Sequence, residues 1–511
     1  MKLDKYICKG GRLNKKDVLG IKINGKYIYP IVDSIYNIYE IEVPSDVKST
    51  AKLYFKAASG ITSKNIASFF EFSGGINPTI ENYSFIGGES GYRCTFNTPG
   101  FYTVKTTEFL YMPFAKTDNL KAYVKTIRTD IVNAKDLFKG SIMASCDCFR
   151  VQGPALTELA NIDYLIGQNE NLLNIIFEDI KAPNLTSAMG PVYDCTALQT
   201  LKFINCEMPN LTTASNLTFY CYASNIELVN CDLSGSTDII EPVSSSLEPQ
   251  RNTTHFKMTN CKFNNATDSF ILILGEDLER FEITDCNFSS VTNFTLRDES
   301  YIERLNFSGN NLDGLTSYSK FILSSKYADT LDLSNCSMKN IGSIRFNTGT
   351  GCNLKNIILD GVNFSSLTTL YSAFRSMTLL TEVDLSNTIT GEINDIQYVF
   401  NGCTMLKKVI FNDKITNLAY CSYAFRDCTY LTEVDMRYAN IISSASVSYM
   451  FSGCEMLKEI RMDNCNKETI QKVITSMNFP TGYIANRLIY CKEENVQGLT
   501  APQGWAFSYV D

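Results

Sequence analysis

Short stretches of alternating apolar and polar residues recur along most of the chain. Each has the pattern apolar–x–apolar followed by a polar pair, and successive copies begin 24 to 30 residues apart. Alternation of this kind predicts a β-strand, and a fixed period predicts that the strands stack as a solenoid. The clear copies begin at Leu201, Ile226, Phe256, Phe281, Leu305, Leu331, Ile357, Val383, Val409, Val434 and Ile460, and weaker ones at Val124, Phe149 and Ile175.

The residue between the two apolar anchors of each strand is expected to point outward, because neighbouring side chains of a strand face opposite sides. These residues are the candidate contact positions on the predicted concave sheet: Lys202, Glu227, Lys257, Glu282, Asn306, Asp332, Asp384, Asp435 and Arg461. Two of the recurring aspartates could serve a glycosidase. The charges are mixed and the pattern locates no cleft, so a solvated face is the favoured interpretation, and protein or glycan binding comes before catalysis.

The 18 cysteines fall mostly at two repeat positions. Six lie five residues after the first strand anchor, where Asn310 takes the place of a cysteine in one copy: Cys206, Cys231, Cys261, Cys286, Cys336 and Cys465. Four lie six residues before the anchor, where Met377 fills the position in another copy: Cys195, Cys403, Cys428 and Cys454. Free cysteine packs as a small apolar residue. We therefore expect two buried ladders, in preference to disulfides or a metal site.

The first 115 residues lack the period and instead predict antiparallel strands. Alternating stretches flank Asn24-Gly25, a dipeptide typical of a two-residue hairpin turn. Further strands are expected near residues 49–59 and 67–75, with a second hairpin around Thr98-Pro99-Gly100. The phrase TPGFYTVKT resembles the end of small immunoglobulin-like sandwiches of the PKD kind. The expected domains are an N-terminal docking arm and hairpin over 1–34, a β-sandwich over 35–115, a solenoid of 12–14 repeats over 116–465 and a cap over 466–511.

Composition narrows the function further. Hydrophobic residues make up 44 % of the chain, which is enough for a core, and the net charge of −8 argues against a nucleic-acid partner. The longest apolar runs, such as FILIL at 270–274, are too short to insert in a membrane. No signal peptide is recognisable, so we expect synthesis in the cytosol in soluble form, with a removed leader as the alternative.

Catalytic motifs are missing from the sequence. The single histidine, His255, has no nucleophile motif beside it, and no phosphate loop, dinucleotide fingerprint or zinc spacing occurs. The Cys146-Asp-Cys148 pair is a weak metal signal without a second ligand pair. We expect a protein that is not an enzyme and that uses no cofactor.

The last four copies carry an additional signature. Each has an aromatic residue ahead of Phe, Cys or Met, and Leu at spacings of three, as in SYAFRDCTYLTEVDM and SYMFSGCEMLKEIRM. These spacings suit a short helical turn on the convex side. The signature resembles the BspA-type leucine-rich repeat of bacterial, protozoan and phage proteins. That resemblance implies a right-handed α/β solenoid with a parallel sheet, preceded here by a small all-β immunoglobulin-like domain.

The resemblance and the composition together imply a structural or adhesive role. The ending PQGWAFSYV resembles the close of phage BspA-like proteins, and the abundance of Asn, Lys, Ile and Tyr resembles the AT-rich coding of crAss-like phages of gut Bacteroidetes. We therefore expect a virion protein, first a tail fibre or tail-associated host-attachment protein and second a head-surface decoration. The alternative is a bacterial or protozoan cell-surface adhesin. The expected partners are other virion proteins through the N-terminal region, a host surface protein or glycan, and further copies of the chain as a homo-oligomer.

Overall fold

The computed structural model describes most of the repeat region and parts of the N-terminal region. The described residues are 21–23, 26–28, 37–43, 51–56, 70–73, 79–84, 90–106, 121–126, 138–139, 148–152, 156, 158–167, 172–218, 221–238, 253–265, 270–274, 278–298, 302–317, 321–325, 327–346, 353–476 and 486–510. The chain divides into two compact units, which are treated separately: Met1–Leu211 with Phe219–Cys221, and Thr212–Thr218 with Tyr222–Asp511. Across the described ranges, no helix is both long enough and apolar enough to span a membrane.

The first unit begins with antiparallel strands, as the alternation predicted. The hairpin β1 (Ile21–Ile23) and β2 (Lys26–Ile28) flanks Asn24-Gly25. One sheet contains β5 (Phe70–Ser73), β8 (Gly100–Thr106), β3 (Asn37–Val43) and β9 (Lys121–Thr126), and another contains β4 (Ala51–Lys56), β7 (Ser90–Phe96) and β6 (Thr79–Ser84). Two antiparallel sheets agree with the expected all-β region, whereas its immunoglobulin-like identity stays a prediction.

The expected second hairpin around Thr98-Pro99-Gly100 is wrong. β7 pairs with β4 and β6, whereas β8 pairs with β3 and β5, so the segment joins two different sheets. The hydroxyl of Tyr102 donates a 2.6 Å hydrogen bond to the carbonyl oxygen of Thr98, and the Tyr102 ring packs on Phe96 at 4.7 Å between centroids. The corner is therefore fixed by a buried tyrosine, and no ladder between the two strands is required.

Parallel pairing begins in the first unit at β9. This strand is antiparallel to β3 on one edge and parallel to β11 (Cys148–Gln152) on the other. β13 (Asn174–Glu178) and β15 (Thr200–Ile204) continue the parallel sheet, and the short β10 (Phe138–Lys139), β12 (Ile166–Gly167) and β14 (Val192–Tyr193) form a second one. The weak copies at Val124, Phe149 and Ile175 are therefore confirmed as strands of the parallel sheet.

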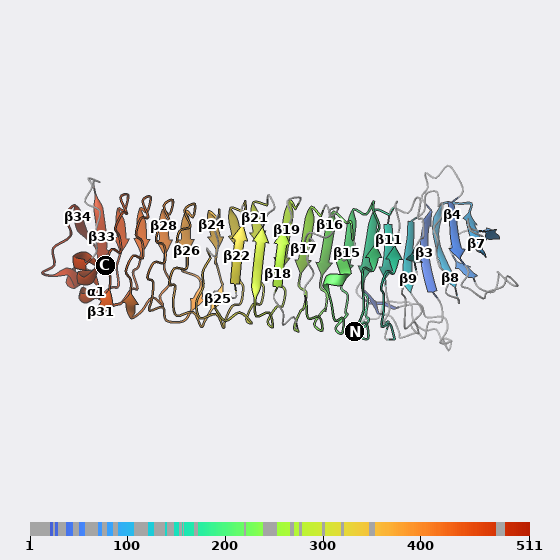
Figure 1. Ribbon diagram of the computed structural model, residues 1–511, viewed down its shortest axis with the longest axis horizontal. Helices are drawn as coiled ribbons and strands as arrows, with labels where there is room; N and C mark the ends of the chain where they lie inside the picture. The colour runs from blue at the N-terminus through green and yellow to red at the C-terminus, as the bar shows by residue number, and fades with distance from the viewer. Residues whose placement is uncertain are drawn as a thin grey trace. The chain divides into compact units, whose positions relative to one another are not determined.

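The second unit is a solenoid in which every clear copy of the repeat from Ile226 on places a strand in one parallel sheet (Figure 1). We call one such strand and the chain that returns from it to the next strand a coil. The strands are β16 (Asn225–Val229), β17 (His255–Thr259), β19 (Arg280–Thr284), β21 (Arg304–Asn306), β23 (Thr330–Asp332), β24 (Asn356–Ile358), β26 (Glu382–Asp384), β28 (Lys408–Ile410), β30 (Glu433–Asp435) and β32 (Glu459–Arg461).

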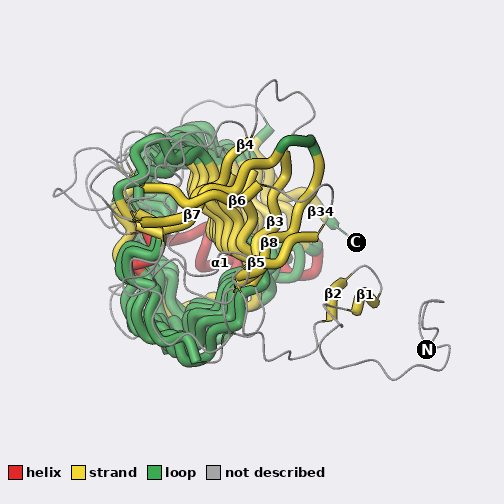
Figure 2. Tube along the Cα trace, turned by 90° about the vertical axis from the view of Figure 1, so that its right-hand side faces the viewer, coloured by secondary structure: helices red, strands yellow, loops and turns green. Residues whose placement is uncertain are grey.

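The coils also carry shorter strands away from the main sheet. Three are β18 (Phe270–Leu274), β20 (Phe294–Asp298) and β22 (Phe321–Ser325), and four more pair as β25 (Asn363–Phe364) with β27 (Ile389–Thr390) and β29 (Leu418–Tyr420) with β31 (Ile441–Ser446). Viewed along the axis on which the coils stack, the strands lie on one side and loops close the rest of each coil (Figure 2).

The core of the solenoid follows from the strand alternation. The anchors Leu331, Val383 and Val434 are fully buried, as apolar residues at every second strand position should be. A second row, on the turn side, stacks Phe346, Phe374, Phe400, Phe425 and Phe451 with centroids 5.0 to 5.5 Å apart. Each coil thus closes its neighbour's core, which a single repeat cannot do alone.

The convex element differs from the expected helical turn. Residues 371–376, 397–402, 422–427 and 448–453 form turns, here called the turn segments, in which two residues of each have positive φ. Backbone N–H groups alternate between a local acceptor and the next coil: Phe425 donates to Met450, Arg426 to Tyr423, and Asp427 to Ser452. In a helix all these N–H groups would donate within the same segment. Because every second one donates to the next coil, the turn segments are not helical.

The C-terminal end continues the sheet past the last repeat. Asn466 caps helix α1 (Lys467–Ser476) by accepting a 2.8 Å bond from the Thr469 N–H, and the helix buries Ile470 and Val473. β33 (Arg487–Cys491), the 3-10 helix η4 (Glu493–Val496) and β34 (Trp505–Tyr509) follow. Both strands pair in parallel with their predecessors, so the residues expected to form a cap, 466–511, include a helix and two further strands of the main sheet.

Candidate binding surfaces

The nine candidate contact residues lie between the strand anchors, as the alternation predicted, but they are not all exposed. Lys257 and Asp384 are exposed, whereas Asp332 and Asp435 are buried, at 5 and 6 % exposure. In the second unit, Glu227, Lys257, Glu282, Asn306 and Asp332 align on successive strands, and Asp435 aligns with Arg461. Lys202 stands in the first unit opposite Ile176. Asp384 is separated from Asp435 by Ile410, so the recurring aspartates are not brought together.

Charges on this sheet face are largely neutralised within the sheet. Lys257 and Arg280 both approach Glu282, at 3.8 and 2.8 Å, and Arg304 approaches Asp332 at 2.5 Å. Arg437 pairs with Asp435, and Arg461 with Asp463 at 2.7 Å. Ion pairs at a surface contribute little stability, but they leave few charges to attract a ligand.

The recurring acidic position has a structural role. The Oδ1 of Asp384 accepts a 2.8 Å bond from the backbone N–H of Ser386, and Asp332 and Asp435 accept in the same way from Ser334 and Arg437. An aspartate that binds the N–H two residues on closes a turn. The aspartates therefore recur because each strand ends in the same turn, a cause that the sequence analysis missed.

The ten ladder cysteines are all buried, and they carry free thiols. The Sγ of Cys403 donates to the carbonyl oxygen of Phe374 at 2.9 Å, Cys428 to Phe400 at 3.1 Å, and Cys454 to Phe425 at 2.9 Å. Burial raises the pKa of Cys336, Cys403 and Cys465 to about 12. A thiol held protonated in this way is neither a nucleophile nor a metal ligand.

Asn310 shows what the first ladder does. Its Nδ2 donates to the carbonyl oxygens of Ile283 and Phe307, at 2.7 and 2.6 Å, and its Oδ1 accepts the N–H of Cys286 at 2.9 Å. Cys336, in the next coil, donates to the same Phe307 oxygen at 3.0 Å. The position thus satisfies backbone groups where the chain leaves the strand.

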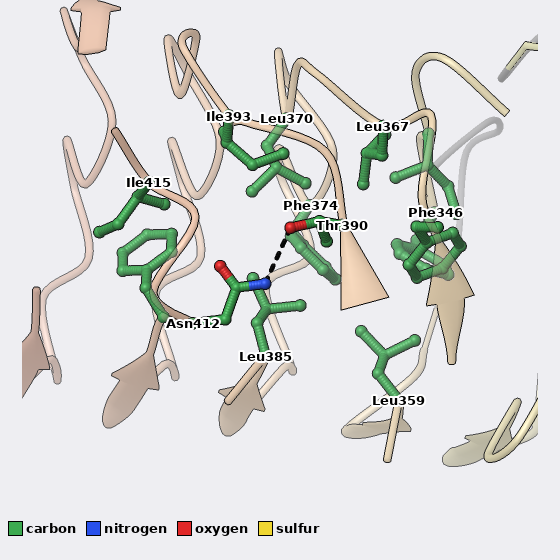
Figure 3. A pocket seen from close by; sticks show the side chains of 13 residues that line it. Phe346, Leu359, Leu367, Leu370, Phe374, Leu385, Thr390, Ile393, Asn412 and Ile415 are labelled. Carbon is green, nitrogen blue, oxygen red and sulfur yellow. Dashed lines mark hydrogen bonds between the residues drawn. The ribbon is translucent and has the colours of Figure 1, made fainter. Parts of the chain in front are cut away.

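One interior cavity lies among coils of the second unit (Figure 3). Its volume is about 10 Å³, close to that of one water molecule. The walls are apolar, including Phe374 and Leu385, apart from Asn412 and Thr390. The Nδ2 of Asn412 donates to the Oγ1 of Thr390 at 2.9 Å. The cavity is a packing defect beside the inward-turned Asn412, and it is too small for an organic ligand.

Residues that could support catalysis are dispersed. The Nδ1 of His255 lies 2.8 Å from the Oγ1 of Thr254, its neighbour in sequence. Among the residues that the structure describes, no three His, Cys, Asp or Glu side chains converge as metal ligands. Cys146 and Cys148, the weak metal pair, have no described side chains.

Aromatic side chains gather on the turn segments, a surface that the sequence analysis did not select. Tyr398, Tyr423 and Tyr449, here called the tyrosine ladder, stack with centroids 4.9 and 5.3 Å apart and planes within 14°. Arg375 and Arg426 lie over the Tyr398 and Tyr423 rings at 5.2 and 5.5 Å. Tyr371 meets Tyr398 edge-on, because Ser372 occupies the ladder position in its coil.

The tyrosine ladder is held in an unfavourable backbone conformation. Tyr398, Tyr423 and Tyr449 have φ of 55°, 60° and 55°, a region that costs a non-glycine residue about 1–2 kcal/mol. By contrast, the left-handed positions after the strands are filled by asparagine, aspartate and glycine, which tolerate this conformation: Asn205, Asn230, Asn260, Asp285, Gly309, Asn335 and Gly361. Tyrosine is therefore present on the turn segments for its side chain, with stacking as a partial compensation.

The repeat that builds this surface matches a known repeat family. The family described as BspA type leucine rich repeat region, in six copies, matches residues 324–432 and 371–488. Residues 324–488 form a BspA-like leucine-rich repeat region. No curated protein matches the chain. The match includes all four turn segments, so the tyrosine ladder belongs to the BspA-type part of the solenoid.

Proposed function

We propose that this BspA-like protein is a non-enzymatic adhesin-type protein that binds a host protein or glycan through its outer surface. The tyrosine ladder is the observation that carries the proposal. Tyrosines on three successive coils have a strained backbone, and strain of this kind is concentrated at functional sites. Tyrosine and arginine, which meet here as Tyr423 and Arg426, are also the residues that most often dominate binding energy.

The geometry of the ladder favours one mode of contact. Each ring of the stack covers the face of the next, so a ligand meets ring edges and phenol hydroxyl groups more readily than ring faces. The rings form a column with centroids 4.9 and 5.3 Å apart, roughly the spacing of β-strands, ~4.8 Å. Such a column suits a partner with repeated polar groups, either an extended peptide or a glycan.

Support for a non-enzymatic role comes from the rest of the surface. The carboxylates that a glycosidase would need are engaged, Asp384 in its own turn and Asp435 with Arg437, and the ladder thiols are buried. The described cavity has room for about one water. A binding surface needs none of the convergent groups that catalysis requires.

The variant Y398F/Y423F/Y449F provides the test, because it removes three hydroxyls and keeps the stack. Labelled full-length protein is applied to a glycan array and to intact bacterial cells, and binding of the variant should fall at least tenfold on whichever probe the native protein binds. The variant Y438F alters an exposed tyrosine outside the ladder and should bind normally. Equal binding by the triple variant and the native protein would contradict the proposal.

In its finer form, the proposal assigns the protein to a bacteriophage virion as a tail fibre or tail-associated attachment protein. Its support is the resemblance of the C-terminal PQGWAFSYV to phage proteins and an abundance of Asn, Lys, Ile and Tyr that resembles AT-rich coding. An N-terminal β-region suited to docking on other virion proteins adds to it. A cell-surface adhesin is the alternative, and a head-surface decoration the second. Mass spectrometry of purified virions, compared with protease shaving of intact cells, separates these locations.

A further inference from the structure

A row of exposed apolar side chains crosses four successive coils of the second unit. Leu379, Met405, Tyr430 and Met456, here called the apolar stripe, are 36, 37, 52 and 41 % exposed. Each directly precedes a buried leucine of the repeat. One coil earlier, the equivalent position holds Asn353, so the stripe has a defined beginning.

Backbone hydrogen bonds keep the stripe continuous. The N–H of Met405 donates to Thr378 at 3.2 Å, that of Tyr430 to Thr404 at 3.2 Å, and that of Met456 to Thr429 at 3.3 Å. Each acceptor directly precedes the stripe residue of the coil before, which is Leu379, Met405 or Tyr430. The four side chains are therefore in register on adjacent coils.

The stripe lies in the most apolar part of the described surface. Nine of the thirteen large hydrophobic side chains that are exposed among the described residues fall between 371 and 456, in less than a fifth of the chain. Single exposed apolar residues need no explanation, but a contiguous group marks an interaction surface. Methionine, tyrosine and arginine are the types enriched in protein interfaces.

Charged side chains flank the stripe in an alternating order. Lys407 and Lys458 follow the stripe residue by two positions in the second and fourth coils, where the first and third coils have Thr381 and Thr432. Glu382 and Glu455 are exposed carboxylates beside the first and fourth coils. Lys407 and Lys458 are likewise exposed, and no ion pair among the described residues includes these two lysines or the two glutamates.

We propose that the apolar stripe binds the same stripe of a second copy of this chain, with the coil order reversed by a two-fold axis. Reversal places Leu379 opposite Met456 of the second copy and Met405 opposite Tyr430, a thioether–aromatic contact that occurs twice. It also places Lys458 beside Glu382 of the second copy. Lysine then never faces lysine, because the coils with Lys407 and Lys458 meet the coils with Thr432 and Thr381.

The size of the stripe sets the strength of the association. Four coils at strand spacing extend over roughly 15–20 Å. That is short for an interface of ~800 Å² per partner, so the dimer should dissociate reversibly on dilution. Self-association is separate from receptor binding by the tyrosine ladder, and a dimer would present two ladders at once.

Sedimentation velocity of the full chain over a 1000-fold range of concentration tests the proposal. Native protein should change from monomer to dimer, and M405E/Y430E, which alters both central contacts, should weaken the dimer at least tenfold. The control I389E adds a carboxylate at an exposed residue of β27, outside the stripe, and should dimerise normally. Circular dichroism and a thermal melt verify that each variant is folded. A native monomer throughout, or an equal effect of both variants, would overturn the proposal.

A charge exchange tests the reversed order. E382K and K458E should each weaken the dimer, and E382K/K458E should restore it, because the two residues meet only across the two-fold axis. The single and double variants all leave the tyrosine ladder intact, so their receptor binding per chain should be unchanged. A double variant as weak as the singles would overturn the reversed arrangement.

Discussion

The thiol of Cys428 donates a 3.1 Å hydrogen bond to the carbonyl oxygen of Phe400 in the preceding coil. The same oxygen accepts the N–H of Cys403 at 3.0 Å. A carbonyl has two lone pairs, and here one serves the local turn and the other joins two coils. Cysteine suits the position because it is small, apolar and still able to donate.

Titration with a thiol reagent should distinguish the buried cysteines from the remaining ones. Fourteen cysteines in the described residues are free and buried, so no more than four of the 18 should react with a thiol reagent at pH 8 in the native protein. All 18 should react in guanidinium chloride without a reductant. Rapid reaction of ten or more in the native state, or a shortfall after unfolding, would show that the ladders are open or oxidised.

Stability should fall as the pH rises above about 8.5. Burial raises the pKa of Cys336, Cys403, Cys421 and Cys465 to about 12, whereas an unfolded thiol titrates near 8.5. Between these values the folded chain keeps protons that the unfolded chain has released. The stabilisation is therefore complete below pH 8 and declines by about 1.4 kcal/mol per pH unit for each thiol. Urea midpoints at pH 7, 8.5 and 10 measure the decline.

The comparison with C403A/C465A isolates the thiols from other groups that titrate in the same range. The variant starts less stable at pH 7 because two buried side chains are truncated. Its stability should fall less steeply between pH 8.5 and 10 than that of the native chain. Parallel curves for the two proteins would assign the pH dependence to groups other than the ladder cysteines.

Asn310 should be replaceable by cysteine more readily than by alanine. N310A leaves the N–H of Cys286 and the carbonyl oxygens of Ile283 and Phe307 without this partner, and we expect a loss of about 2–4 kcal/mol. N310C restores a donor of the kind that Cys336 supplies one coil later, so its loss should be smaller. Urea denaturation measures both, and an equal or larger loss for N310C than for N310A would contradict the prediction.

Replacement of Tyr423 by glycine should destabilise the protein less than replacement by alanine. Both Y423G and Y423A lose the stacking with Tyr398 and Tyr449, but φ of 60° strains alanine and not glycine. We expect Y423G to be more stable than Y423A by about 1 kcal/mol. At Tyr438, whose φ is not positive, the order should reverse, with Y438G below Y438A. The same order at both positions would refute the strain at the ladder.

The strand positions could be predicted from the sequence because their period is simple and local. Each anchor from Leu201 to Ile460 lies in a parallel strand, and the cysteines at fixed offsets are buried. The convex turns were harder, because spacings of three at Phe425, Cys428 and Leu431 suit a helix and a turn equally. The choice depends on acceptors in the next coil, which a single repeat does not contain.

The candidate surface was predicted less well for a related reason. The recurrence of Asp332, Asp384 and Asp435 was visible in the sequence. Its cause, a hydrogen bond from the backbone N–H two residues further on, was not. The tyrosine ladder had a visible signal in the aromatic residue before each Phe. Its importance depends on φ, and nothing in the sequence marks Tyr423 as left-handed.

In the turn segments, backbone N–H groups at every second residue donate to the next coil, and those between them donate within their own turn. Phe425 donates to the next coil, Arg426 within its own turn, and Asp427 again to the next coil. Insertion of one residue would exchange the two roles for every amide that follows and would move the phenylalanine out of the core. Insertion or loss of a whole coil leaves every role unchanged. Evolution can therefore lengthen or shorten this protein easily by whole coils, and hardly at all by single residues within a turn.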